Sequence, residues 1–116
     1  MIFSSGGWRY LILSTTAVLT LSEPAQAGSA ALGSITDLRP HSSGMFFMQT
    51  GVRNAAPSCA TVTQRWAIDV STPQGQAMAA ALLTAYIARK RITILGTDTC
   101  SVWANTETID HFTLED

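Results

Sequence analysis

The chain has 116 residues, of which 47% are hydrophobic, and its charged side chains nearly balance, giving a formal net charge of −1. This length fits a single domain. Proteins that bind nucleic acids need a basic patch to displace counterions, so the charge balance argues against a nucleic-acid partner. It also gives no reason to expect binding to an anionic membrane surface.

The start of the chain carries the three regions of a secretory signal peptide. Arg9 precedes an apolar run at residues 10–21, and Ala25 and Ala27 supply the small side chains that signal peptidase accepts. An uncleaved membrane anchor is the alternative, but a run of about a dozen residues is too short for a hydrocarbon core of ~30 Å. We therefore expect residues 1–27 to be removed and the product to be periplasmic or secreted, with no membrane attachment after cleavage.

Residues 28–116 would form one small domain that contains both cysteines of the chain, Cys59 and Cys100. A domain of this size has a modest core and gains from an extra constraint. Cysteines of exported proteins usually pair, so we expect a structural disulfide. A zinc site and a redox pair are poorer alternatives, because the two histidines are distant and no C-x-x-C spacing occurs.

Three strands are predicted before the helix, at residues 34–39, 45–50 and 64–70, where apolar and β-branched side chains alternate or cluster. We expect residues 28–33 to be a mobile lead-in, because their side chains are small and weakly patterned. Residues 53–58 are predicted to be a loop that leads to the first cysteine. The strand at 45–50 carries large apolar groups on both faces, which is unusual for a half-exposed strand.

A helix is predicted to begin at Thr72 and Pro73, a capping residue followed by proline at the first helical position, and to end near Arg89 or Lys90. Strands at 91–95 and 107–114 follow it. The order β-β-β-α-β-β makes the domain mainly β with one helix, an α+β fold. This is the order of a five-stranded OB-fold-like Greek-key barrel. A general α+β sandwich is the alternative.

No catalytic motif stands out, and we expect no enzymatic activity, no metal site and no cofactor. His41 lies beside two serines, but neighbours in sequence rarely form a nucleophilic site, so a polar turn is the simpler interpretation. Neither a Gly-x-Ser-x-Gly elbow nor a His-Glu-x-x-His motif occurs. Four carboxylates of the domain show no informative spacing and are expected to be solvated: Asp69, Asp98, Glu107 and Asp110.

The candidate ligand-binding residues are Trp103 and Asn105, with Arg53 and Asn54 beside them. A loop tryptophan next to an amide suits a sugar, because aromatic faces and a few placed polar groups build such sites. Arg53 and Asn54 would approach Trp103 if the disulfide forms. The alternative for Trp103 is a packing role against the disulfide or over the barrel end.

The predicted helix is apolar nearly all round, which exceeds what one small barrel can cover. We expect one face of it to point to the barrel, through Met78, Leu82 and Tyr86. An adjoining face is the candidate interface of a homo-oligomer, through Ala79, Leu83 and Ile87. The alternative is a helix half-buried in its own barrel, with a harmless alanine-rich face outside.

Four segments resemble the receptor-binding B subunit of subtilase cytotoxin, an AB5 toxin, and its small exported OB-fold relatives. These segments are residues 66–75, 82–85, 96–103 and 107–109, and the resemblance spans most of residues 33–114. It implies a pentameric ring, a sialylated glycan ligand and an A-subunit-like partner. We therefore expect an exported, non-enzymatic binding module that recognises a glycan or a protein surface. An envelope-associated structural or interaction protein without a glycan ligand is the alternative.

Overall fold

The computed structural model describes residues 27–115. The expected signal peptide lies outside the described residues, except for Ala27. The elements in chain order are β1 (Ser29–His41), β2 (Gly44–Gln49), β3 (Arg53–Ala55), β4 (Arg65–Ile68), α1 (Pro73–Ile87), β5 (Arg91–Gly96) and β6 (Glu107–Glu115). Within these residues no helix is long and apolar enough to cross a membrane.

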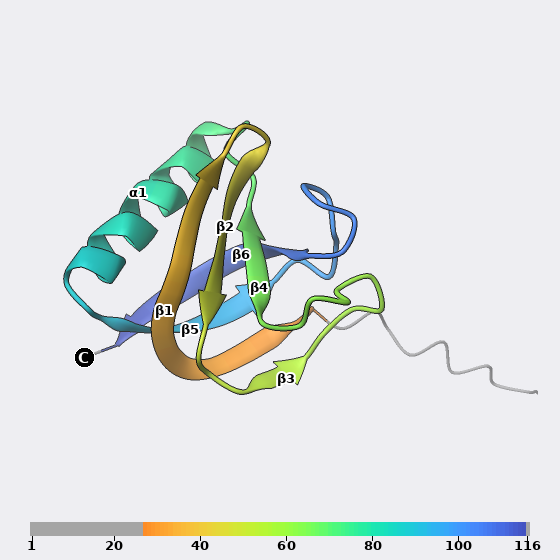
Figure 1. Cartoon of the computed structure of the whole chain (residues 1–116), viewed down its shortest axis with the longest axis horizontal. Coiled ribbons are helices and arrows are strands. Elements are labelled where there is room, and N and C mark those ends of the chain that lie inside the picture. The colour runs from red at the N-terminus through yellow and green to blue at the C-terminus, as the bar shows by residue number, and fades with distance from the viewer. Residues whose placement is uncertain (1–26, 116) are drawn as a thin grey trace, which may run out of the picture.

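Five of the strands close into a barrel (Figure 1). β1 pairs antiparallel with β2 on one edge and with β5 on the other. β2 continues to β4, β4 pairs in parallel with β6, and β6 pairs with β5, which completes the circuit. The domain is therefore mainly β with one helix and a closed five-stranded barrel, compatible with the predicted OB-fold-like α+β class.

The short strand β3 corrects the predicted order, because four strands precede the helix instead of three. β3 lies outside the barrel circuit and pairs antiparallel with the start of β1. It occupies part of the predicted loop at residues 53–58. The predicted strand at 64–70 is also shorter, and only Arg65–Ile68 is paired.

The prediction of a mobile lead-in at residues 28–33 is wrong, because β1 begins at Ser29 and pairs with β5 from that residue. Small side chains are needed here for close backbone approach. A Cβ atom at Gly33 would lie 2.2 Å from the Gly51 nitrogen, and one at Gly51 would lie 2.0 Å from the Ala31 oxygen. Weak side-chain patterning therefore reflects tight backbone packing and not mobility.

The core combines the inner face of the barrel with one side of α1. Its largest fully buried apolar side chains are Phe47, Trp66, Ile68, Leu82 and Ile92. The two-faced pattern of β2 is resolved here, because Phe47 points to the core whereas Phe46 is only partly buried. The second apolar face of β2 therefore lies on the outside of the barrel.

Helix α1 begins as predicted, with the hydroxyl of Thr72 accepting from the Gly75 nitrogen at 3.0 Å and Pro73 in the first turn. It ends at Ile87, earlier than predicted. Arg89 takes the left-handed conformation with φ 54°, and the N–H of Lys90 donates to the Ala85 oxygen at 2.9 Å. These features close the helix in the manner of a left-handed C-terminal cap.

The orientation of α1 differs in part from the prediction. Leu82 is fully buried and Met78 is partly buried against the core, whereas Tyr86 is 44% exposed. Ala79 takes an inner position with 8% exposure, so it does not share the outer face with Leu83 and Ile87. Gly75 and Ala85 complete the buried stripe, because small residues let the helix lie close to the strands.

The predicted disulfide is confirmed: Cys59 and Cys100 are bonded, with 41 residues of sequence separation. The bond joins the segment before β4 to the β5–β6 loop, residues 97–106. That loop and α1 lie on opposite sides of the barrel in the view of Figure 1.

Candidate functional site: an aromatic face on the barrel

A partly exposed cluster, here called the aromatic face, lies on the outside of β1, β2 and β4. Its members are Arg39, His41, Phe46, Arg65 and Trp103. The strand register explains the grouping, because Arg39 is the cross-strand partner of Phe46, and Arg65 pairs with the neighbouring Met48. Side chains on one face of adjacent strands lie within contact distance. The face therefore arises from three strands and one loop.

Trp103 covers the outer side of β2 from the β5–β6 loop. Its ring lies 5.2 Å from the Phe46 ring at 88° and 5.7 Å from the His41 ring at 77°. Edge-to-face contacts of this kind stabilise aromatic clusters by about 0.5–1.5 kcal/mol per pair beyond area burial. Gly44 permits the approach, since a Cβ atom there would lie 2.9 Å from a Val102 methyl group and 3.6 Å from Trp103.

Two guanidinium groups flank the Phe46 ring. The Cζ atom of Arg65 lies 5.1 Å from the ring centroid, and that of Arg39 lies 5.8 Å away. Arg39 also bonds Asp37 at 2.7 Å, and this hydrogen bond raises the pKa of Arg39. The face therefore combines aromatic surface with positive charge.

Asn105 fixes the position of the Arg65 side chain. Its Oδ1 atom accepts a hydrogen bond from Nη2 of Arg65 at 2.7 Å, while Nε of Arg65 donates to the Thr106 hydroxyl at 2.8 Å. A tight turn fixes the loop, because the Thr106 nitrogen donates to the Trp103 oxygen at 3.2 Å. These hydrogen bonds fix the loop that carries Trp103.

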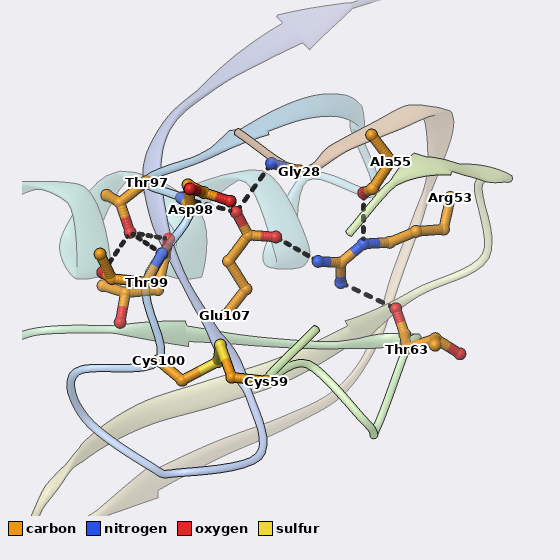
Figure 2. Close-up of polar contacts among 11 residues, drawn as sticks. Gly28, Arg53, Ala55, Cys59, Thr63, Thr97, Asp98, Thr99, Cys100 and Glu107 are labelled. Carbon is orange, nitrogen blue, oxygen red and sulfur yellow. Dashed lines mark hydrogen bonds and ion pairs between the residues drawn. A yellow bond between two sulfur atoms is a disulfide. The ribbon is translucent and has the colours of Figure 1, made fainter. Parts of the chain in front are cut away.

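A second polar centre lies inside the barrel at Glu107 (Figure 2). Glu107 has 0% side-chain exposure, so the expectation that this carboxylate is solvated is wrong. Its Oε1 atom accepts from Arg53, and its Oε2 atom accepts from the backbone nitrogens of Gly28 at 2.8 Å and Asp98 at 2.9 Å. A buried carboxylate requires such partners.

Arg53 belongs to this interior centre. Its side chain is only 9% exposed, and its Cζ atom lies 3.7 Å from the centroid of the Trp66 ring. It also donates to the backbone oxygens of Ala55 at 3.0 Å and Thr63 at 2.8 Å. Burial lowers the pKa of Arg53, although Glu107 opposes that effect.

The predicted binding residues therefore separate into two groups. Trp103 and Asn105 belong to the aromatic face, whereas Arg53 contacts Glu107 and Trp66, and Asn54 is exposed on β3. The alternative for Trp103 was packing against the disulfide or over the barrel end, whereas the structure places its ring edge-to-face with Phe46 and His41 on the outer side of β2.

Sequence reasoning missed four members of the aromatic face as binding residues: Arg39, His41, Phe46 and Arg65. The available signal was the two-faced apolar pattern of residues 45–50. Only the register of β2 against β1 and β4 reveals which residues accompany Phe46 on the outer surface.

The arrangement suits binding by stacking, hydrogen bonding and charge. The hydroxyl of Ser42 lies 3.5 Å from Nδ1 of His41, and both residues are exposed. A nucleophile needs a base within about 2.6–3.2 Å that is itself oriented by a third group. Among residues 27–115 no three side chains of His, Cys, Asp or Glu gather as a metal site.

Comparison of the chain with protein-family models, curated proteins and solved structures finds no match.

Proposed function

We propose that the chain is an exported, non-enzymatic binding module with OB-fold topology, and that its aromatic face binds a glycan. The position of the face carries the proposal. OB-folds bind ligands on their second and third strands and on the loops between strands one and two and strands four and five. With β3 set aside, these parts are β2, β4, the turn after β1 and the β5–β6 loop, which carry the aromatic face together with the end of β1, where Arg39 and His41 lie.

The chemistry of the face favours a sugar with an acidic group. The rings of Phe46 and His41 meet Trp103 at steep angles, so neither lies flat on the indole. Aromatic side chains with a few placed polar groups are what small-ligand sites use. Arg39 and Arg65 add cations beside the rings, and guanidinium groups bind carboxylates well. The resemblance to AB5 toxin B subunits points to the same ligand class.

A face of aromatic and arginine side chains also suits single-stranded nucleic acid, which OB-folds often bind. The net charge of −1 and the expected export favour a sugar instead. An interaction protein without a glycan ligand is the other alternative. These candidates differ in measurable ways, because nucleic-acid binding would weaken steeply with salt.

Self-association is part of the proposal. Leu83 is 45% exposed and Ile87 is 73% exposed on the outer side of α1, and exposed apolar groups of this kind often mark an interface. A ring built through α1 would leave the aromatic face free, because the helix and the loop of Trp103 lie on opposite sides of the barrel (Figure 1). A pentamer with an A-subunit-like partner is the assembly that the resemblance implies.

The first experiment is a glycan array with the full chain, exported into a bacterial periplasm and purified in oxidised form. We expect binding to acidic sugars, and at least tenfold weaker binding by the Trp103→Leu variant. Tyr86→Leu is the matched control, because Tyr86 is 44% exposed on α1 and outside the aromatic face. An array without bound sugar, or equal binding by the Trp103 variant, would contradict the glycan proposal. Salt-sensitive binding of single-stranded DNA would favour the second candidate.

The molar mass of the same sample, measured by light scattering after size exclusion, tests the assembly. We expect a multiple of the protomer mass, with about five protomers for a toxin-like ring. The Ile87→Lys variant should dissociate it while glycan binding by single protomers persists. A wild-type monomer would exclude the ring and leave the aromatic face to be judged on the array alone.

A further inference from the structure

Gly28 is the first residue after the expected cleavage site, and its backbone nitrogen points at a buried carboxylate. This nitrogen lies 2.8 Å from Oε2 of Glu107, whose side chain has 0% exposure (Figure 2). Ala27 is exposed, so the chain leaves the barrel directly before this contact. The expected cleavage would therefore create a new α-amino group next to Glu107.

The fit around Gly28 is tight. A Cβ atom there would lie 1.8 Å from Oε1 of Glu107 and 2.9 Å from Nη2 of Arg53, so only glycine is accommodated. The Gly28 oxygen accepts from the Gly96 nitrogen at 2.7 Å, and the next residue enters the β1–β5 ladder. The backbone at Gly28 is thus fixed from both sides, which holds its nitrogen against the carboxylate.

Cleavage changes the chemistry of this nitrogen. In the precursor it is an amide with one hydrogen and no charge. Hydrolysis breaks the bond between Ala27 and Gly28, with water supplying the oxygen of the new Ala27 carboxylate and a proton to the nitrogen. Below the pKa of the amine, the nitrogen takes up a further proton and becomes an ammonium group with three hydrogens. The amide already makes a charge-assisted bond to the carboxylate, and the ammonium group adds the direct attraction of two opposite charges.

We propose that removal of the leader completes a buried ion cluster, in which the α-ammonium group of Gly28 joins Arg53 on the carboxylate of Glu107, so that the processed protein is more stable than the unprocessed chain. This proposal rests on the export in the proposed function. It does not depend on the glycan or on the ring.

The surroundings of the ammonium group set the expected pH dependence. Glu107 faces it from β6, Arg53 contacts the same carboxylate from β3, and the backbone nitrogen of Asp98 donates to that carboxylate from the β5–β6 loop. The ordinary pKa of an α-amino group is about 8. Burial and the Arg53 cation lower the pKa of this amine, whereas the adjacent carboxylate of Glu107 raises it, and the proposal requires the carboxylate to outweigh the other two effects in the folded state. The stabilisation is therefore complete below about pH 8 and is lost as the pH rises through the folded-state pKa.

Two precursors provide the comparison, each produced as the full chain with its own leader. One is wild type, and the other carries Gly-Ser inserted between Ala27 and Gly28, which moves the amine away from Glu107 after the same cleavage. Intact mass identifies the N-terminus of each product. A wild-type product that starts at a residue other than Gly28 would overturn the proposal. The glycan array tests the proposed function separately.

Urea unfolding of both products between pH 6 and pH 10 is the main measurement. We expect the unfolding equilibrium constant of the wild type to be about tenfold smaller at pH 7, which corresponds to one unit of pKa shift. The two products should converge as the pH approaches 10. Equal stability at pH 7, or a difference that does not depend on pH, would overturn the proposal.

Glu107→Gln in both precursors tests whether the carboxylate of Glu107 is the partner of the α-ammonium group. The variant keeps an acceptor for the backbone donors but removes the charge, so the difference between the two N-termini should disappear. A readout on the folded wild type covers the case in which this variant does not fold. The rate of α-amine acetylation against pH gives the amine pKa, and a value at or below about 8 would overturn the proposal.

Discussion

The interior ion pair allows a sharp test, because Arg53 contacts a buried carboxylate and an aromatic ring and donates to two backbone oxygens. Replacing Arg53 by Met keeps most of the side-chain volume over Trp66 but removes the guanidinium group from the carboxylate of Glu107, which then keeps only the nitrogens of Gly28 and Asp98 as partners. Breaking a buried pair by removing one partner costs about 3–5 kcal/mol. We expect the free energy of unfolding to fall by that amount at pH 7.

The assay is urea unfolding of the oxidised protein, followed by the fluorescence of Trp66 and Trp103. The double variant Arg53→Met with Glu107→Gln should lose less than the sum of the single variants, by about 2 kcal/mol, because interacting neighbours are not additive. If Arg53→Met unfolds the domain, Arg53→Lys gives a measurable intermediate, since lysine keeps the charge but lacks the planar fork. A loss below about 0.5 kcal/mol, or strict additivity, would refute the assignment of Arg53 to the interior.

Two further predictions concern the covalent frame and the start of the helix. Replacing both Cys59 and Cys100 by Ser opens a loop with a sequence separation of 41, and should lower the free energy of unfolding by about 4 kcal/mol in the chain-entropy model; a loss under 1 kcal/mol in urea unfolding would contradict it. Hydrogen bonds from Ser71 lower the pKa of Asp69, so this carboxylate stabilises the fold above its ordinary pKa and the contribution is lost as the pH falls through its folded-state value. Ser71→Ala should raise the Asp69 pKa in an NMR titration, and an unchanged value would exclude the hydrogen-bond mechanism.

Local patterns were sufficient for most elements of this fold. The start of α1 at Thr72 and Pro73 follows from capping chemistry, which acts over three or four residues. The pairing of Cys59 with Cys100 follows from the expected oxidising compartment and the absence of other cysteines. Which face of α1 is buried was harder to predict, because a helix that is apolar nearly all round has no distinct apolar stripe. Close packing of the helix on the strands favours small residues such as Ala79 on the buried face.

The aromatic face and the ion pair of Arg53 and Glu107 both depend on contacts between distant parts of the chain. Arg53 and Glu107 are separated by 54 residues, and each looks like an ordinary surface charge in its own sequence context. The sequence offered no partner for the second apolar face of residues 45–50, and the structure places Trp103 of the β5–β6 loop against Phe46 on that face. Such pairings follow from barrel closure and register, and no local period encodes them.

The β5–β6 loop connects the aromatic face with the interior ion pair, and this link bears on the proposed glycan binding. Glu107 stands at the end of the loop inside the barrel, Cys100 ties its middle to the segment before β4, and Trp103 lies between them on the outer face. A loop held at both places loses little conformational freedom when a ligand arrives, and preorganisation of this kind raises affinity. Replacement of Arg53 should therefore weaken glycan binding indirectly, because it loosens the β5–β6 loop. Replacement of Trp103 should weaken glycan binding while the ion pair of Arg53 and Glu107 stays intact.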